Sequence, residues 1–144
     1  MKNLLKKRCL LDTNILVAFL NRKHPYHSQA REIFEKLSSE EFKGVVSSQN
    51  LLELGAVLVH AFKISRQQAA KDLSLFFSDP LFEVIYPTPE VLERFFKLMK
   101  KVSGLHIVDL FLLATALTHK VEILISADRE FLKIKEIEVY NPFK

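Results

Sequence analysis

Four acidic residues stand alone within apolar parts of this sequence, and their side chains are the ones best suited to chemistry. They are Asp12, Glu53, Asp109 and Asp128. Asp109, for example, is the only Asp, Glu, Lys or Arg in residues 102–119. Burying an unpaired carboxylate in a core is unfavourable. Four such residues therefore indicate that the carboxylates share a cation, and a divalent metal ion is the simplest candidate.

The ligand types available in the chain limit which metal it could hold. Carboxylate oxygens favour Mg²⁺ or Mn²⁺, whereas zinc favours nitrogen and sulfur ligands. The five histidines show no zinc-like pairing, and Cys9 has no second cysteine as a partner. Protein-bound Mg²⁺ usually keeps several waters and contacts substrate phosphates. We therefore expect metal-dependent hydrolysis of a phosphodiester, in which the ion lowers the pKa of a bound water and stabilises the leaving oxygen.

The composition is that of an ordinary folded domain. Of the 144 residues, 49% are hydrophobic, so disorder is not expected. The net charge of +4 is compatible with a nucleic-acid partner but does not require one. Polar residues interrupt every long apolar stretch, so no membrane span is predicted. A lone cysteine in an apolar segment fits a reducing environment, and we expect a cytoplasmic protein.

The hydrophobic pattern predicts strands that alternate with helices. The predicted strands are residues 8–11, 44–47, 82–86, 122–125 and 137–140. The predicted helical segments are residues 14–20, 28–37, 49–62, 66–77, 89–102, 107–118 and 129–133. Such alternation predicts a three-layer α/β/α fold with a mainly parallel central sheet. Because the sequence contains no linker and no internal repeat, we expect residues 1–144 to form a single domain.

The predicted elements allow the four acids to meet. In open parallel sheets, functional residues gather at the carboxyl ends of the strands. Asp12 follows the first predicted strand, and Asp128 lies three residues beyond the fourth. Glu53 and Asp109 lie near the starts of two predicted helices. All four side chains could therefore face one edge of the sheet.

Each acid also has a purely structural interpretation. Asp12, Asp109 and Asp128 all stand where an Asp could cap a helix. Glu53 lies inside a predicted helix and needs no such explanation, but it could belong to a partly exposed polar stripe. That stripe would consist of Gln49, Asn50, Glu53 and His60.

Four segments resemble, in order, the motifs of the PIN-domain nucleases. They are residues 10–16 (LLDTNIL), 47–54 (SSQNLLEL), 109–116 (DLFLLATA) and 124–131 (LISADREF). Each motif alone is weakly specific, but together they cover essentially the whole chain. The resemblance implies a compact α/β/α domain that cleaves RNA with Mg²⁺ or Mn²⁺. In size the chain is most similar to VapC-type toxins of prokaryotic toxin–antitoxin pairs.

The resemblance also implies roles for particular residues and partners. Asp12, Glu53, Asp109 and Asp128 match the catalytic and metal-binding acids, and Asn14 and Ser126 match polar residues that support them. Ser126 stands where the family more commonly has Thr. The implied partners are an RNA substrate, a cognate antitoxin and a second copy in a homodimer. Two alternatives stay open: a non-catalytic RNA-binding or scaffold module on the same fold, and an RNA-processing enzyme that is not a toxin.

Overall fold

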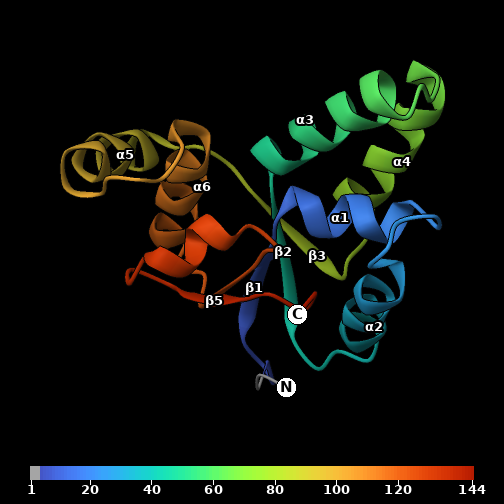
Figure 1. The fold of residues 1–144 in the computed structure, drawn as a ribbon, viewed down its shortest axis with the longest axis horizontal. Coiled ribbons are helices and arrows are strands. Elements are labelled where there is room, and N and C mark those ends of the chain that lie inside the picture. Colours follow the sequence, from blue (N-terminus) through green and yellow to red (C-terminus); the bar gives the residue numbers. More distant parts are fainter. Residues whose placement is uncertain (1–3) are drawn as a thin grey trace.

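A central sheet of five strands organises the protein, seen here in a computed structural model that describes residues 4–144 (Figure 1). The strands are β1 (Arg8–Leu11), β2 (Lys43–Ser47), β3 (Phe82–Ile85), β4 (Ile123–Ile125) and β5 (Glu138–Tyr140). Their order in the sheet is β3-β2-β1-β4-β5, and every neighbouring pair is parallel. The predicted α/β fold is confirmed, with a sheet that is wholly rather than mainly parallel. The strand order changes direction at β1, because β2 and β3 lie on one side of it and β4 and β5 on the other. Parallel sheets form a crevice at such a position.

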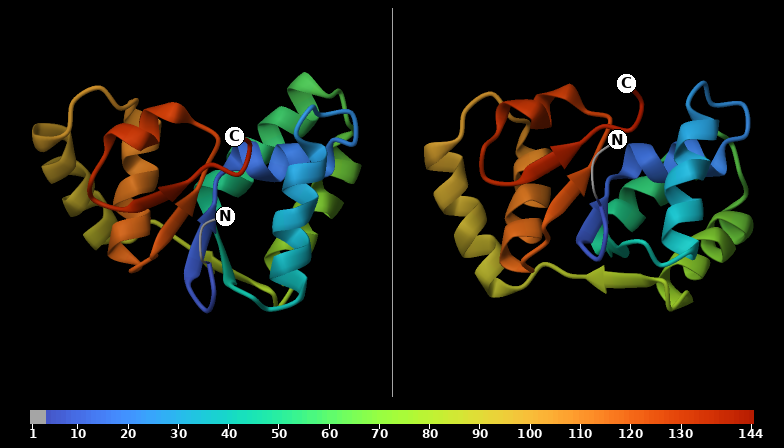
Figure 2. Two further views of the ribbon diagram at one scale, coloured as in Figure 1. Left: turned by 60° about the horizontal axis from the view of Figure 1, so that its bottom comes forward. Right: turned by 90° about the horizontal axis from the view of Figure 1, so that it is seen from below.

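Helices cover both faces of this sheet (Figures 1 and 2). One side carries α1 (Thr13–Leu20), α2 (His27–Ser38), α3 (Ser48–Ala56) and α4 (Arg66–Ser78). The other side carries α5 (Pro89–Lys101) and α6 (Ile107–Thr118). A short 3₁₀ helix, η2 (Arg129–Lys133), joins β4 to β5. This arrangement is the three-layer architecture that the alternation of strands and helices predicts.

The inner strands β1, β2 and β4 read largely as apolar runs because both of their faces are buried. In β1, Cys9 and Leu11 join the core under α1–α4, whereas Leu10 joins the core under α5 and α6. The same alternation holds in β4, whose middle residue Leu124 faces α5 and α6. Because successive side chains of a strand point to opposite faces of the sheet, one apolar run contributes to both cores.

One predicted element differs in kind from the structure, and other predicted boundaries differ by one residue. The predicted helix 49–62 is not one regular α-helix, because α3 ends at Ala56 and a π-helical turn, η1 (Val57–Ala61), follows it. The backbone N–H of Phe62 donates to the oxygen of Val57, five residues back, while Leu58 stays fully buried. No Gly or Pro within this turn signals it in the sequence. The predicted strand 82–86 ends at Ile85, and the predicted strands 122–125 and 137–140 begin one residue late.

The strongly apolar helix α6 is a core helix. Its residues from Leu112 to Ala116 are all buried, while its first two residues, Ile107 and Val108, are exposed at the sheet edge. Within residues 4–144, none of the helices combines the length and apolar character needed to cross a bilayer.

A glycine in β2 provides a test of how closely the layers pack. A Cβ atom at Gly44 would lie 2.9 Å from Leu37 Cδ1 and 3.3 Å from the backbone oxygen of Leu81. We expect Gly44→Ala to lower the free energy of unfolding by about 1–2 kcal/mol through overpacking, as measured by urea denaturation. The control is Gly55→Ala in α3, where the Cβ meets only Leu73 Cδ1 at 3.1 Å. Better helix propensity should offset that contact, so equal losses in the two variants would contradict this packing.

Candidate metal centre

A pocket of about 350 Å³ opens at the carboxyl ends of the central strands. It is lined by Asp12, Thr13, Asn14, Val17, His24, Glu53, Val57, Asp109 and Asp128. All four acids singled out in the sequence therefore lie around one space, although they come from distant parts of the chain. The lining contains no Lys or Arg. Within residues 4–144, no ion pair reaches any of the four acids.

Asp12 is the most buried of the four acids, with only 7% of its surface exposed. It directly follows β1, and its backbone N–H donates to the oxygen of Ile125 at the end of β4. Its carboxylate accepts four hydrogen bonds, and all of the donors are neutral. These donors are the Thr13 backbone N–H (2.8 Å), the Ser126 hydroxyl (2.7 Å), and the side-chain amides of Asn14 (3.4 Å) and Asn50 (3.4 Å).

Asn50 connects this carboxylate to α3, and sequence reasoning missed its contribution. Ser47 and Asn50 form a reciprocal capping box at the start of α3, in which the Ser47 hydroxyl donates to Asn50 Oδ1 at 2.7 Å. This contact turns the amide Nδ2 of Asn50 toward Asp12 and toward the Thr13 hydroxyl, 3.0 Å away. Thr13 in turn donates to Glu53 Oε1 at 3.2 Å. In the sequence, the spacing of Ser47 and Asn50 is that of a capping box, and this spacing could have indicated the role of Asn50.

Ser126 and Asn14 connect β4 to the same carboxylate. The Ser126 hydroxyl donates to Asp12 and accepts from the backbone N–H of Asp128 at 3.1 Å. The side-chain oxygen of Asn14 accepts from the backbone N–H of Ala127 at 3.1 Å. These bonds hold the turn after β4 against the start of α1, and they bring Asp128 to the pocket.

Asp109 approaches the pocket from the other helical layer. It is the third residue of α6, whose first turn is joined to α3 by a hydrogen bond of 3.0 Å from Gln49 Nε2 to the oxygen of Val108. His106, not Asp109, caps this helix, with Nδ1 accepting from the Val108 backbone N–H. The capping interpretation of Asp109 is therefore wrong, and its carboxylate is available to the pocket.

The other structural interpretations are only partly correct. Asp12 does cap α1, and Asp128 does cap η2 by accepting from the Glu130 backbone N–H. Both acids also line the pocket, so capping and a place in the site are compatible. Glu53 is partly exposed, as the polar-stripe interpretation expects, but Asn50 does not belong to such a stripe because it is fully buried.

Three of the four acids, Asp12, Glu53 and Asp109, have raised pKa values. Burial raises the pKa of Asp12, and the Asp128 carboxylate raises it further, against the hydrogen bonds from Ser126, Thr13 and Asn50. Burial and the charge of Asp12 raise the pKa of Glu53. Burial, with Asp128, Asp12 and Glu53, raises the pKa of Asp109 to about 6, although the charge of His106 opposes this shift. The neighbouring carboxylates therefore make ionisation of Asp12, Glu53 and Asp109 harder, as expected for like charges.

The donor set fits an oxygen-preferring divalent ion. The pocket offers four carboxylates plus neutral oxygen atoms, and no Lys or Arg lines it. Within the part of the chain that the structure describes, no group of three or more Asp, Glu, His or Cys side chains is arranged so that it could hold a metal ion.

The fold and this pocket together define a class of protein: a parallel α/β domain with an acidic centre at the carboxyl edge of its sheet. The family model for the PIN domain matches residues 9–137. The chain belongs to the PIN-domain family, which confirms the resemblance carried by its four motifs. Nucleases of this family generally depend on divalent metal ions. Among curated proteins, none is similar enough to count as a match.

Solved structures of two toxin–antitoxin complexes and of one toxin share the fold along almost the whole length of the matched chains. A chain of VapBC2 from Rickettsia felis, bound to a promoter DNA fragment, is 22% identical with a TM-score of 0.70 and covers 93% of this chain and 98% of its own. A chain of a toxin–antitoxin complex from Klebsiella pneumoniae is 25% identical with a TM-score of 0.67, and the match covers 94% of this chain and 98% of the other. VapC20 from Mycobacterium tuberculosis, a toxin that cleaves the sarcin–ricin loop, is 15% identical with a TM-score of 0.68. This match covers 90% of this chain and 98% of VapC20.

The raised pKa of Asp109 predicts how stability depends on pH without metal. Its pKa is about 6 in the fold and ordinarily 3.8, so between about pH 4 and 6 the folded state holds more protons than the unfolded state. The free energy of unfolding should therefore fall as pH rises through this window. Asp109→Asn should flatten the fall and stabilise the metal-free protein by about 1 kcal/mol at pH 7, after allowing for solvent screening. Urea denaturation in EDTA at pH 4 and pH 7 measures this.

The control for this experiment is Asp72→Asn, which changes an acid on α4 outside the acidic pocket. It should leave the pH dependence as in the wild type. Mn²⁺ should then stabilise the wild-type protein more than Asp109→Asn, because the ion binds only the folded state. A loss of stability in metal-free Asp109→Asn at pH 7 would contradict the crowding of charge.

Proposed function

We propose that this chain is an endoribonuclease that depends on Mg²⁺ or Mn²⁺ and acts as the toxin of a type II toxin–antitoxin pair. The observation that carries the proposal is the convergence of four carboxylates, without a cationic side chain, in one pocket of a PIN domain. Its structural relatives come from toxin–antitoxin complexes, and one relative is described as cleaving the sarcin–ricin loop. We propose that it works in the cytoplasm as one domain, with RNA as its substrate and an antitoxin as its regulator.

In this proposal Asp12 and Asp109 are the main metal ligands, and Glu53 and Asp128 complete the site directly or through water. A bound ion would supply a water of lowered pKa and would stabilise negative charge on the leaving oxygen. Asp12 is suited to ligation because four neutral donors fix its orientation before any ion arrives. Ser126, Asn14 and Asn50 are thus positioning residues.

In this proposal Glu53 takes a proton from the attacking water. Its pKa is raised by burial and by Asp12, so it is a stronger base than an ordinary glutamate. Hydrogen bonds from the side chains of Thr13 and Gln49 would orient it. The other three acids would hold the ion, which would bind the scissile phosphate, and Glu53 would accept the proton that the water loses.

Exposed apolar residues support protein partners. Leu92, Phe96 and Met99 recur at helical spacing on α5, and their exposed fractions are 44%, 55% and 48%. A row of this kind on one helix face is characteristic of a surface that another protein covers. We propose that a second copy in a homodimer covers it.

The central test is cleavage of RNA with and without metal. Purified protein should cut a labelled RNA in Mn²⁺ or Mg²⁺ and should stop when EDTA removes the ion. Asp109→Asn should lower the cleavage rate by about 10²-fold or more while the far-UV circular dichroism spectrum stays unchanged. Induced expression in cells should arrest growth for the wild type and not for this variant.

The matched control is again Asp72→Asn, which should cleave like the wild type. Activity of Asp109→Asn within a few-fold of the wild type would contradict the assignment of this carboxylate. RNA binding that needs no metal and leads to no cleavage would instead favour the alternative, a non-catalytic RNA-binding or scaffold module on the same fold.

A further inference from the structure

The connection between α1 and α2, residues 21–26, reaches the acidic pocket through His24. His24 is partly buried and lines the same pocket as the four acids. Its Nδ1 accepts a hydrogen bond of 3.1 Å from the backbone N–H of Tyr26. In the neutral ring this contact places the proton on Nε2, which has no hydrogen-bond acceptor among the described residues. The Nε2–H group of His24 is therefore a hydrogen-bond donor that no acceptor within residues 4–144 uses.

Aromatic rings form a platform next to this histidine. Tyr26 stacks on Phe143, with ring centroids 4.8 Å apart and planes only 8° from parallel. Phe143 is 8% exposed, whereas Tyr26 is 41% exposed. One face of Tyr26 is therefore covered by Phe143, while a large part of this residue stays exposed. The ring of His24 lies 6.1 Å from that of Tyr26 and 6.3 Å from that of Phe143.

The backbone around the platform is held in place. The His27 ring bonds the oxygen of Ala18 at 2.9 Å, and the backbone N–H of His24 donates to the oxygen of Asn21 at 2.9 Å. On the other side, the Asn141 side chain accepts from the backbone N–H of Phe143 at 2.9 Å. The platform is thus preformed, which reduces the entropy lost when a ligand binds.

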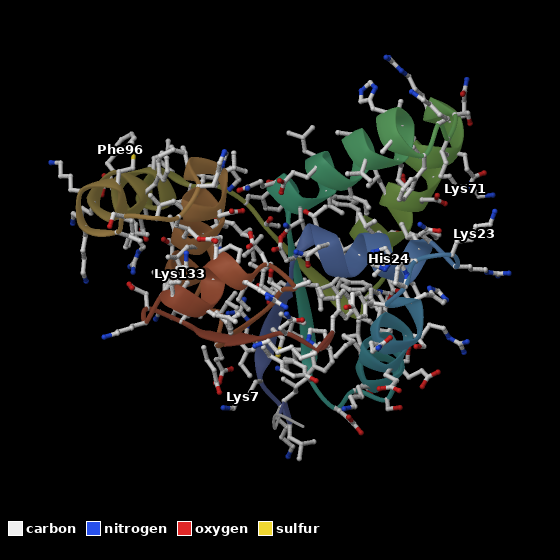
Figure 3. All side chains as sticks on the ribbon, viewed as in Figure 1. Lys7, Lys23, His24, Lys71, Phe96 and Lys133 are labelled. Carbon is white, nitrogen blue, oxygen red and sulfur yellow. The ribbon has the colours of Figure 1, made fainter. Side chains whose placement is uncertain are left out.

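The connection itself is cationic. It contains Arg22 and Lys23 and no Asp or Glu, whereas Arg31 on α2 pairs with Glu35 at 3.5 Å. Figure 3 shows Lys23 extending outward from the connection that carries His24. Arg22 also lines a second hollow of about 710 Å³ beside the connection. The residues that flank His24 in the sequence are therefore positive, while the pocket that His24 lines is negative, an arrangement that suits a polyanion bound through metal.

We infer that the α1–α2 connection holds the nucleotide next to the scissile phosphate of a single-stranded RNA, with His24 donating to a phosphate and the exposed Tyr26 stacking on a base. This inference rests on the proposed function, and it specifies single-stranded RNA as the form of the substrate that the site binds. Stacking on an aromatic ring is available to any base and requires an unpaired strand. Lys23 and Arg22 add contacts to neighbouring phosphates. The acidic wall opposite would repel the backbone and direct the strand along this connection.

The test is the affinity of a fluorescein-labelled, single-stranded RNA of about 12 nucleotides, measured by anisotropy in Mn²⁺. All proteins carry Asp109→Asn so that the RNA stays intact. Tyr26→Leu keeps an apolar side chain over Phe143 but removes the stacking face, and it should weaken binding by about tenfold. Tyr26→Phe should restore the affinity. His24→Ala should weaken binding by about three- to tenfold.

The control is Phe77→Leu on α4, which removes another exposed ring away from the pocket and should leave affinity unchanged. Mn²⁺ affinity should be unaltered in Tyr26→Leu, and its far-UV circular dichroism spectrum should stay that of the parent. An affinity of Tyr26→Leu equal to that of the parent, or equal losses in Tyr26→Leu and Phe77→Leu, would overturn the inference. Unchanged RNA affinity together with loss of a co-purifying protein would also overturn it, in favour of a protein-binding site.

Failure of this inference is distinguishable from failure of the proposed function. Loss of RNA affinity in Tyr26→Leu supports the binding site whether or not the wild-type protein cuts the RNA. Absence of Mn²⁺-dependent cleavage by the wild type contradicts the nuclease activity, and normal binding by Tyr26→Leu contradicts only the role of the connection.

Discussion

Asp12 carries a nearly buried negative charge that only neutral groups solvate, and the arrangement of the site depends on it. Its four hydrogen-bond donors come from α1, from α3 and from the turn after β4. These bonds orient the carboxylate without neutralising it, so the repulsion from Asp128, Glu53 and Asp109 persists. The fold tolerates this repulsion because its two cores supply enough apolar burial elsewhere. A divalent cation is the ligand that would relieve it.

The sheet topology explains how residues so distant along the chain come to share this charge. Because β1 lies between β2 and β4, the ends of all three strands open on the same edge. Asp12 and the turn before Asp128 follow β1 and β4 directly, while α3 follows β2 and carries Glu53. The fourth acid arrives with α6, whose first turn Gln49 joins to α3. Each acid therefore depends on a different parallel strand or helix start, and none is placed by its sequence neighbours alone.

Much of this arrangement could be predicted from the sequence, for physical reasons that also set the limit. The inner strands were predictable because strands buried on both faces are largely apolar runs. Asp12, Glu53 and Asp109 were conspicuous because each is the only charged residue in an apolar stretch. Asn50 escaped notice because an amide is unremarkable in a polar list, and only the structure shows it turned inward by Ser47. The π-turn after Ala56 depends on how Leu58 packs, which no local residue signals. His24 reaches the pocket through the fold of a connection, so its distance from the acids could not be read from spacing.

The account as a whole rests on a divalent ion being the missing counter-charge in the pocket. Anomalous X-ray scattering from a crystal of the protein grown or soaked in Mn²⁺ would locate the ion directly. We expect the strongest anomalous difference peak in the pocket, within coordination distance of Asp12 and Asp109. Good diffraction at saturating Mn²⁺ with no peak among these carboxylates, or with the ion bound elsewhere on the molecule, would contradict the account.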